Sequence, residues 1–361
     1  MSDFKFIDLF AGIGGMRIAF DELGGECVFS SEIDPKACEV YKENFGVDPK
    51  FDITTVDPKK DIPDFDVLVG GFPCQAFSMA GKRKGFEDSR GRLFDYIEKI
   101  LLEKQPKAFL LENVKGLKSH DHGNTLKNIL ERLDDAGYFV PEPRILNAID
   151  YNVPQNRERI YIVGFRKDLS VEPEDFHYPG PVDIREDQRC TLKSILEDDV
   201  DRKYYLSRQY LDCLVKHKET QSEKGRGFGY AILDPEKDIG SNTLMTGGMG
   251  RERNLVVGKP LSDYSPVNGR HSEINHENIR RLTPREFSRL QRFPNDFRCD
   301  VADTHAYRLF GNSVAIDVVY YIGLEMMKTL VKANAIRSYE ERNPNSDKYD
   351  YSKDKENTIN T

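Results

Sequence analysis

One cysteine, Cys74, stands behind a proline in the segment GGFPCQAFS, directly after the apolar residues 65–69. A lone cysteine is usually an inert, buried hydrophobe, and that interpretation has to be weighed here. Two features argue against an inert thiol. Pro73 stiffens the turn and removes a backbone donor, and the turn lies where an expected buried strand ends. This position favours a thiol that is presented as a nucleophile.

A carboxyl group and two arginines are candidates to assist such a nucleophile. Glu112 follows the apolar residues 108–111, and apolar neighbours should raise its pKa and keep a proton on it. Arg157 and Arg159, in QNRERIYIVGF, lie at i and i+2 and therefore on one face of an expected strand. Taken alone, a glutamate at a strand end is mostly solvated, and the arginine pair is typical of surface charge on an edge strand.

A glycine turn and two acidic positions suggest a nucleoside site. The segment DLFAGIGG, residues 8–15, reads as a strand, a glycine turn and a helix start, which lets a ligand approach the backbone. Glu32 ends the next expected strand, where a carboxylate can accept ribose hydroxyls, and Asp52-Ile53 ends a third apolar run. The turn lacks a lysine for phosphate, which favours a nucleoside without a triphosphate. A tight structural turn explains the glycines about equally well.

A basic segment lies between Cys74 and the next expected helix. From residue 82 to 92 there are five basic and two acidic residues, a local charge of +3. Beside a nucleophile, a glycine-flanked basic segment is typical of a lid that grips phosphates. A flexible, solvated loop is the alternative.

The elements that must position these residues alternate along the first half of the chain. Expected strands cover residues 4–10, 26–33, 66–70, 108–111 and 157–165, and the last should pair with the segment around Ile145. Expected helices cover 16–23, 93–101 and 126–133, and another opens at Asp34-Pro35 with a cap residue and a proline. This alternation predicts an α/β fold with a mostly parallel sheet and helices on both faces.

The second half divides differently. Residues 166–278 are rich in charged residues, glycine and proline, and predict a smaller unit of loops and short strands. Thr283-Pro284-Arg285-Glu286 reads as a capping box, and an amphipathic helix is expected over 313–332. We therefore expect a catalytic and cofactor-binding domain at 1–165, a second domain at 166–278, a return segment at 279–335, and a polar, disordered tail at 336–361.

Composition narrows the class of protein. The 361 residues are 38% hydrophobic and 32% charged, and no stretch is apolar enough for a membrane span. The first residues enter a strand at once, so we expect no leader peptide. The six cysteines show no metal or disulfide spacing, which favours a cytoplasmic location. A net charge of −8 argues against indiscriminate coating of nucleic acid but not against a local basic face.

The motifs FAGIGG, GFPCQAFS, ENV, QNRERIYIVGF, RLTPREFSRLQRFP and YRLFGNSVA occur in this order. As an ordered series they resemble the DNA (cytosine-5)-methyltransferases, and most closely the compact bacterial enzymes of restriction–modification systems. The resemblance covers residues 4–165 and 279–332. It implies a Rossmann-like, S-adenosylmethionine-dependent methyltransferase sheet, with residues 166–278 as an irregular, β-rich target-recognition domain.

By this resemblance, Cys74 is the nucleophile that attacks C6 of a cytosine flipped out of the duplex. Glu112 protonates or hydrogen-bonds N3, Arg159 holds the base near O2, and Arg157 helps to position the site. Methyl transfer from S-adenosylmethionine to C5, with S-adenosylhomocysteine as the product, is followed by elimination of the thiol.

The resemblance also assigns ligand contacts. The implied cofactor contacts are Phe10, Gly12, Gly14, Glu32, Ile33, Asp52, Ile53, Pro73, Asn312, Ser313 and Val314. Ile33 stands where relatives often carry an aromatic residue, so adenine packing is expected to be aliphatic. The implied DNA contacts are Gln75, Ser78, Lys82, Arg83, Lys84, Arg90, Arg92, Thr243, Arg251 and Arg253. For those of the recognition domain, a glycine-rich surface loop with incidental charge is the alternative.

The expected partner is double-stranded DNA, bound by a monomer in a cell that could also hold a restriction endonuclease for the same site. Two other functions stay open. One is a tRNA cytosine-5 methyltransferase, which the length of the 166–278 insert disfavours. The other is a catalytically silent DNA-binding relative, which the presence of Cys74, Glu112 and Arg159 disfavours. The sequence does not give the recognition site.

Overall fold

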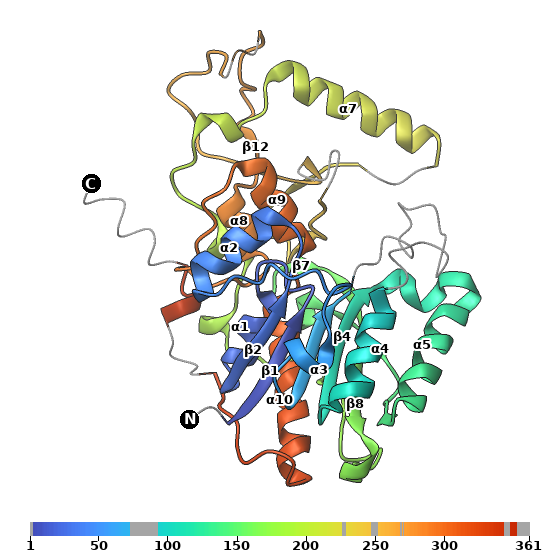
Figure 1. Cartoon of the computed structure of the whole chain (residues 1–361). Coiled ribbons are helices and arrows are strands. Elements are labelled where there is room, and N and C mark those ends of the chain that lie inside the picture. The colour runs from blue at the N-terminus through green and yellow to red at the C-terminus, as the bar shows by residue number, and fades with distance from the viewer. Residues whose placement is uncertain are drawn as a thin grey trace.

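The structure is a computed structural model that describes residues 3–72, 93–225, 229–246, 252–267, 269, 271–342 and 347–351. Its centre is a seven-stranded sheet in the order β2-β1-β3-β4-β8-β5, with β6 also paired to β8 (Figure 1). The strands are β1 (Phe4–Leu9), β2 (Gly25–Ser31), β3 (Val67–Gly71), β4 (Ala108–Val114), β5 (Tyr138–Phe139), β6 (Arg144–Asn147) and β8 (Glu158–Arg166).

The sheet is mixed rather than wholly parallel. Strands β2, β1, β3 and β4 run parallel, whereas β8 is antiparallel to β4 and also to β5 and β6. The prediction of an α/β fold is confirmed, as is the pairing of the last strand with the segment around Ile145, which lies opposite Ile160. Because four strands are parallel, their carboxyl ends meet at one edge, where ligands of such sheets bind.

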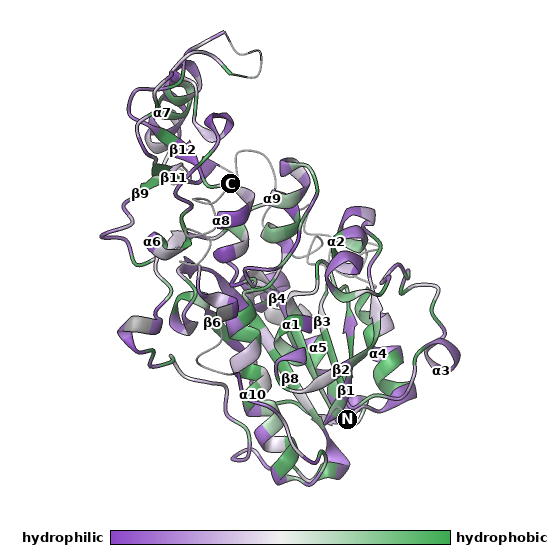
Figure 2. Cartoon of the chain, turned by 90° about the vertical axis from the view of Figure 1, so that its left-hand side faces the viewer, coloured by the Kyte–Doolittle hydropathy of each residue, from purple (hydrophilic) through white to green (hydrophobic). Residues whose placement is uncertain are grey.

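Alternating side chains bury both faces of the sheet. Toward α1 (Gly15–Asp21) and α10 (Ile316–Lys332) point Phe4, Phe6, Val67, Val69, Ala108, Leu110, Tyr161, Val163 and Phe165. Toward α4 (Leu93–Lys104) and α5 (Asn124–Asp135) point Ile7, Leu9, Leu68, Phe109, Leu111, Ile160 and Ile162. A strand buried on both faces reads as a continuous apolar run, which is why the sequence marked these strands clearly. The hydropathy colouring shows them as green arrows between the helix layers (Figure 2).

Short elements complete the sheet edge. Helix α2 (Pro35–Phe45) begins as expected, because the Asp34 side chain accepts hydrogen bonds from Lys36 N and Ala37 N. Helix α3 (Pro58–Asp61) follows. The apolar run that Asp52-Ile53 was expected to end does not form a strand: the segment is a turn, preceded by a single bridge between Glu32 and Lys50.

The smaller unit carries α6 (Leu192–Ile195), α7 (Arg208–Glu223) and a three-stranded sheet of β9 (Ala231–Leu233), β11 (Asn254–Val257) and β12 (Ile279–Arg281). It lies above the carboxyl edge of the main sheet in Figure 1. The 16-residue α7 was not expected, because only Leu211 and Leu214 on it are buried and so its periodic signal is weak. β12 begins at the expected domain boundary and pairs with β11.

The return segment contributes α8 (Pro284–Arg289), α9 (Asp303–Asn312) and α10. The capping box is confirmed: Glu286 N donates to Thr283 Oγ1 (3.1 Å), and Thr283 N donates to Glu286 Oε2 (2.8 Å). The single helix expected over 313–332 starts later, at Ile316, because Ser313 ends α9 in an extended conformation. In the part of the chain that the structure describes, no helix combines the length and hydropathy needed to cross a bilayer.

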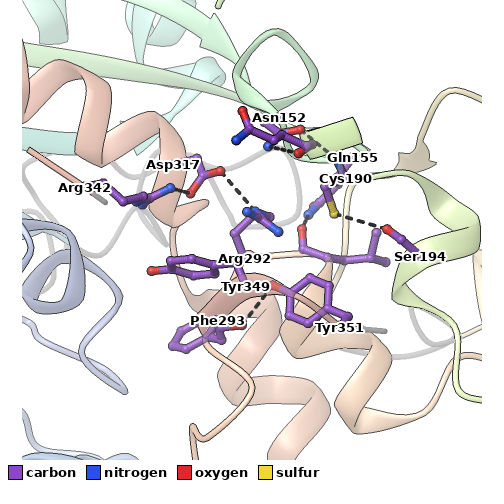
Figure 3. Close-up of polar contacts among 12 residues, drawn as sticks. Asn152, Gln155, Cys190, Ser194, Arg292, Phe293, Asp317, Arg342, Tyr349 and Tyr351 are labelled. Atoms are coloured by element: carbon purple, nitrogen blue, oxygen red, sulfur yellow. Dashed lines mark hydrogen bonds and ion pairs between the residues drawn. The ribbon is translucent and has the colours of Figure 1, made fainter. Parts of the chain in front are cut away.

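Part of the tail that was expected to be disordered packs on the body. Figure 3 shows Tyr349 and Tyr351 beside Arg292, which pairs with Asp317 at 3.1 Å. The Tyr351 ring lies 5.4 Å from the Arg292 guanidinium carbon, and its hydroxyl donates to Phe293 O at 2.9 Å. We call this contact of Tyr349 and Tyr351 with the body the tail anchor. The sequence did not predict it, because the two tyrosines stand among charged residues and are held by stacking on arginines rather than by an apolar run.

Tyr351 should therefore contribute measurably to stability. Because its side chain is buried, Tyr351→Ala should lower the free energy of unfolding by about 3 kcal/mol, whereas Tyr351→Phe, which loses only the hydroxyl bond, should cost about 1 kcal/mol. Urea unfolding measures both. Tyr210→Ala, at a side chain that is 37% exposed on α7, is the matched control and should change stability by less than about 1 kcal/mol. Equal losses at both tyrosines would contradict the tail anchor.

Candidate active site

A cavity of about 370 Å³ opens at the carboxyl edge of the parallel strands. Predicted residues from the first and last parts of the chain line it together, namely Phe10, Gly12, Glu32, Ile33, Asp52, Ile53, Glu112, Arg157, Arg159, Asn312, Ser313 and Val314. The proposed nucleoside wall and the proposed catalytic carboxyl group thus share one space. A ligand in this cavity would contact both.

The glycine turn after β1 holds the Glu32 carboxylate. Gly12, with φ of 55°, donates its N–H to Glu32 Oε2 at 2.8 Å. Glu32 Oε1 accepts from the N–H groups of Ile33 and Asp34, both at 2.8 Å. A carboxylate has about four acceptor positions, so three backbone bonds fix its orientation and leave capacity for a ribose hydroxyl.

Two apolar side chains are presented to the cavity near this carboxylate. Ile33 is 68% exposed and Phe51 is 49% exposed, although both line the cavity. Phe51 reaches this wall because the Glu32–Lys50 bridge places it beside the end of β2. Phe51 thus adds an aromatic ring to the same wall, while aliphatic packing of adenine at Ile33 stays a prediction. Asp52, next to it, turns its side chain to Thr54 N at 2.9 Å.

Glu112 lies near the end of β4, opposite Gly71 of β3. Arg159 Nε approaches Glu112 Oε1 to 3.2 Å, and both side chains are mostly buried. Burial raises the pKa of Glu112, and the guanidinium groups of Arg159 and Arg157 offset only part of this effect. A Cβ atom at position 71 would stand 3.2 Å from Glu112 Oε2, so the glycine keeps room for the carboxyl group. The site can hold a protonated carboxyl beside a cation.

Arg157 turns away from this pair toward the return segment. Its Nη2 donates to Gly311 O (3.1 Å) and Ser313 O (2.5 Å), which brings residues 312–314 to the cavity. Burial, followed by the charge of Arg159, lowers the pKa of Arg157 to about 9. Arg157 is therefore a positioning residue for the opposite wall.

Gly14 is not among the lining residues. It caps α1 with φ of 86°, and a Cβ there would lie 2.3 Å from the Phe45 ring, so it serves turn geometry and packing. Gly14 thus shapes the turn that carries Gly12.

The smaller unit is joined to the QNRER segment. Strand β7 (Gln155–Asn156) pairs with β10 (Ser241–Asn242), and Leu244 N donates to Gln155 Oε1 at 3.0 Å. Thr243 Oγ1 donates to Asn156 O, and Arg253 Nη1 contacts Met245 Sδ at 3.3 Å. Thr243 thus ties the two units together.

Several predicted residues lie outside the described part of the chain. They are Pro73, Cys74, Gln75, Ser78, Lys82, Arg83, Lys84, Arg90, Arg92 and Arg251. Their roles stay predictions. Asn113 contacts Phe72, the last described residue before Pro73, because its Nδ2 donates to Phe72 O at 3.2 Å.

The sequence matches the family described as C-5 cytosine-specific DNA methylase over residues 4–328. The chain belongs to this family. Its enzymatic class is therefore that of a DNA cytosine-5 methyltransferase, and the resemblance noted in the sequence is confirmed.

Named relatives and solved structures agree. The chain is 54% identical to the Type II methyltransferase M.HpaII of Haemophilus parainfluenzae, over 91% of this chain and 90% of that protein. It is 38% identical to M.HhaI of Haemophilus parahaemolyticus, over 91% and 96%. The S. pombe Dnmt2 methyltransferase structure matches in fold, with a TM-score of 0.67 and 22% identity over 91% of this chain and 98% of that one.

The lining residues of the methyltransferase to which sequence reasoning assigned no role include Asp8, Phe51, Asn113 and Arg308. Asp8 and Asn113 stand inside quoted motifs, so their polarity next to apolar residues was a usable signal. Arg308 also stands inside a quoted motif, YRLFGNSVA, whereas nothing in the local sequence of Phe51 marks it. Among the described residues, no group of three or more potential metal ligands comes together.

Asp8 is a buried carboxyl group on β1. Burial raises its pKa from 3.8 to about 8, against the opposing charge of Arg17, and its Oδ2 has no hydrogen-bond partner among the described residues. Between these pH values the folded chain holds the proton more tightly than the unfolded chain does. Its contribution to stability is thus fully present below pH 4 and is lost as the pH rises toward 8.

Asp8→Asn should remove this dependence because the amide carries no titrating proton. We expect the melting temperature of the variant to exceed that of the wild type by more at pH 8 than at pH 5. Thermal unfolding in matched buffers measures the difference. The same difference at both pH values would show that Asp8 is not a buried neutral carboxyl.

Proposed function

We propose that the protein transfers a methyl group from S-adenosylmethionine to C5 of a cytosine flipped out of double-stranded DNA, through a covalent bond between Cys74 and C6. The observation that carries this proposal is the single cavity that joins Glu32 and Asp52 to Glu112 and Arg159. Methyl transfer requires donor and base within bonding distance, which a shared cavity permits.

The residues present fit the donor. The oriented Glu32 carboxylate suits the ribose, while Ile33 and Phe51 offer apolar surface to adenine. When bound, S-adenosylmethionine supplies an electrophilic methyl group and leaves as S-adenosylhomocysteine. Asn312, Ser313 and Val314, held by Arg157, form the opposite wall.

The proposed steps follow from the chemistry of cytosine. The Cys74 thiolate forms a bond to C6 while Glu112 gives its proton to N3, so the electron pair of the C5–C6 double bond becomes available at C5. C5 then takes the methyl group. Loss of the C5 proton to water, breakage of the C6–S bond and return of the N3 proton to Glu112 restore the aromatic ring, the thiolate and the carboxyl group.

Chain connectivity supports this role for Cys74. Phe72 is held by Asn113, the neighbour of Glu112, and lines the cavity. Cys74 follows two residues later, and two residues of extended chain span at most about 7 Å. This short link to the cavity wall supports the proposed role of the Cys74 thiol.

The recognition function is proposed for residues 166–278, with Thr243, Arg251 and Arg253 as candidate contacts. Residues 82–92 would close on DNA phosphates. Several relatives are named Type II methyltransferases, and on this basis we propose that the enzyme protects a short DNA sequence against a partner endonuclease. The similarity to the S. pombe structure concerns the fold and does not identify a substrate. The tRNA alternative from the sequence is therefore compared with DNA in the experiment below.

Transfer of a radiolabelled methyl group to duplex DNA should be abolished by Cys74→Ala. Glu112→Gln should reduce kcat by about 10²–10⁴-fold, because the amide cannot deliver a proton to N3. Glu158→Gln is the matched control: Glu158 pairs with Lys115 at 2.8 Å and should leave the rate unchanged. Greater incorporation into tRNA than into DNA would contradict the proposed substrate.

DNA that carries 5-fluorocytosine should trap the wild-type protein, because fluorine at C5 cannot leave as a proton does. Denaturing electrophoresis should then show a protein–DNA adduct in wild type and none in Cys74→Ala. Unshifted wild-type protein would contradict the covalent step.

A further inference from the structure

An ion pair joins the two walls of the cavity at its outer side. Arg308, on α9, contacts the Asp34 carboxylate with both terminal nitrogens, Nη2 to Oδ1 at 3.2 Å and Nη1 to Oδ2. The two residues are 274 positions apart in the sequence, and both line the cavity. The contact therefore connects the first part of the chain to the return segment where a ligand would lie between them.

Asp34 is linked directly to the proposed ribose acceptor. Its side chain caps α2, and its backbone N–H donates to Glu32 Oε1 at 2.8 Å. The hydrogen bond from Arg308 is the main reason that the pKa of Asp34 is lowered, so the carboxylate stays charged and keeps its cap. A shift of Asp34 would move a donor that orients Glu32.

Arg308 also shares a helix face with the opposite wall. Arg308 and Asn312 are four residues apart on α9 and so lie on the same side of the helix. Asn312 lines the cavity together with Ser313 and Val314. One helix face therefore contacts the nucleoside side through Arg308 and presents the opposite wall through Asn312.

We propose that Arg308 and Asp34 are positioning residues for the methyl donor, and that their ion pair sets the separation between Glu32 and Asn312. This inference rests on the proposed function, because the ligand is S-adenosylmethionine. Without the ion pair, the distance between α9 and the start of α2 would vary more widely, and part of the free energy of donor binding would be used to bring them together. The dissociation constant of the donor should therefore change more than the rate of the chemical step.

A second bridge between the same parts of the chain provides a matched control. Arg298 Nη2 contacts Glu43 Oε1 of α2 at 2.8 Å, and Arg298 N donates to Asn44 Oδ1 at 2.9 Å. Arg298 does not line the 370 Å³ cavity. A purely structural link between α2 and the return segment would therefore respond to either substitution.

The test is calorimetric titration of the full chain with S-adenosylhomocysteine, for wild type, Arg308→Met, Arg308→Lys, Asp34→Asn and Arg298→Met. Arg308→Met and Asp34→Asn should each weaken binding about fivefold, the value of a good, partly exposed pair. Asn is as good a helix cap as Asp, so Asp34→Asn should keep the fold. Arg308→Lys should fall between, and Arg298→Met should bind like wild type.

Two further readouts separate positioning from simple stability. The double variant Arg308→Met with Asp34→Asn should bind no more weakly than either single variant, because both remove the same contact. KM for S-adenosylmethionine should rise with the dissociation constant, while kcat at saturating donor falls by a smaller factor.

Three results would overturn the inference: wild-type affinity in Arg308→Met, an equal loss in Arg298→Met, or additive losses in the double variant. If wild type itself fails to bind S-adenosylhomocysteine, the proposed function fails, and the inference fails with it. The two failures are distinguished by whether the loss occurs in wild type or only in the comparison among variants.

Discussion

The buried guanidinium of Arg157 is the contact on which the site depends. It joins the start of β8 to the carbonyl groups of Gly311 and Ser313, which lie 154 and 156 positions later in the sequence. Burying a cation is costly unless hydrogen bonds and a nearby carboxylate compensate. Arg157 retains its place through two carbonyl acceptors and the attraction of Glu112, at the cost of a lowered pKa.

A second buried network connects the same part of the chain to the smaller unit. Gln155 donates to Leu290 O at 2.8 Å and accepts from Leu244 N at 3.0 Å, so its amide contacts both the return segment and the smaller unit. Gln291 Nε2 donates to Phe310 O at 3.0 Å. Because breaking a hydrogen bond of a buried amide is costly, these bonds hold the two units in a fixed relation beside the cavity.

Patterns within one element were readable from the sequence. The doubly buried strands, the Asp34 cap and the Thr283–Glu286 capping box all follow from local rules and all appear in the structure. The cavity position of Glu112 followed from its strand, because carboxyl ends of parallel strands share an edge. The antiparallel direction of β8 did not, since an apolar run carries no information on strand direction.

Contacts between distant parts of the chain were not readable. Arg308 meets Asp34, Phe51 meets the end of β2, and Tyr351 meets Arg292 only after the fold has formed. Phe51 and Tyr351 sit beside charged neighbours in the sequence, and local polarity predicts exposure to solvent. The expectation that a polar stretch of sequence stays exposed to solvent fails here. Stacking on arginine side chains and ion pairing can bury such a stretch.

The order of the chain has a consequence for synthesis. Helix α10, which covers one face of the sheet, comes about 150 residues after β8, so at 5–20 residues per second roughly 8–30 s of translation separate them. During that interval the nascent sheet exposes apolar side chains that only late residues can cover. An incomplete product also lacks residues 312–314, so a ribosome that stops early releases a chain whose cavity is missing one wall.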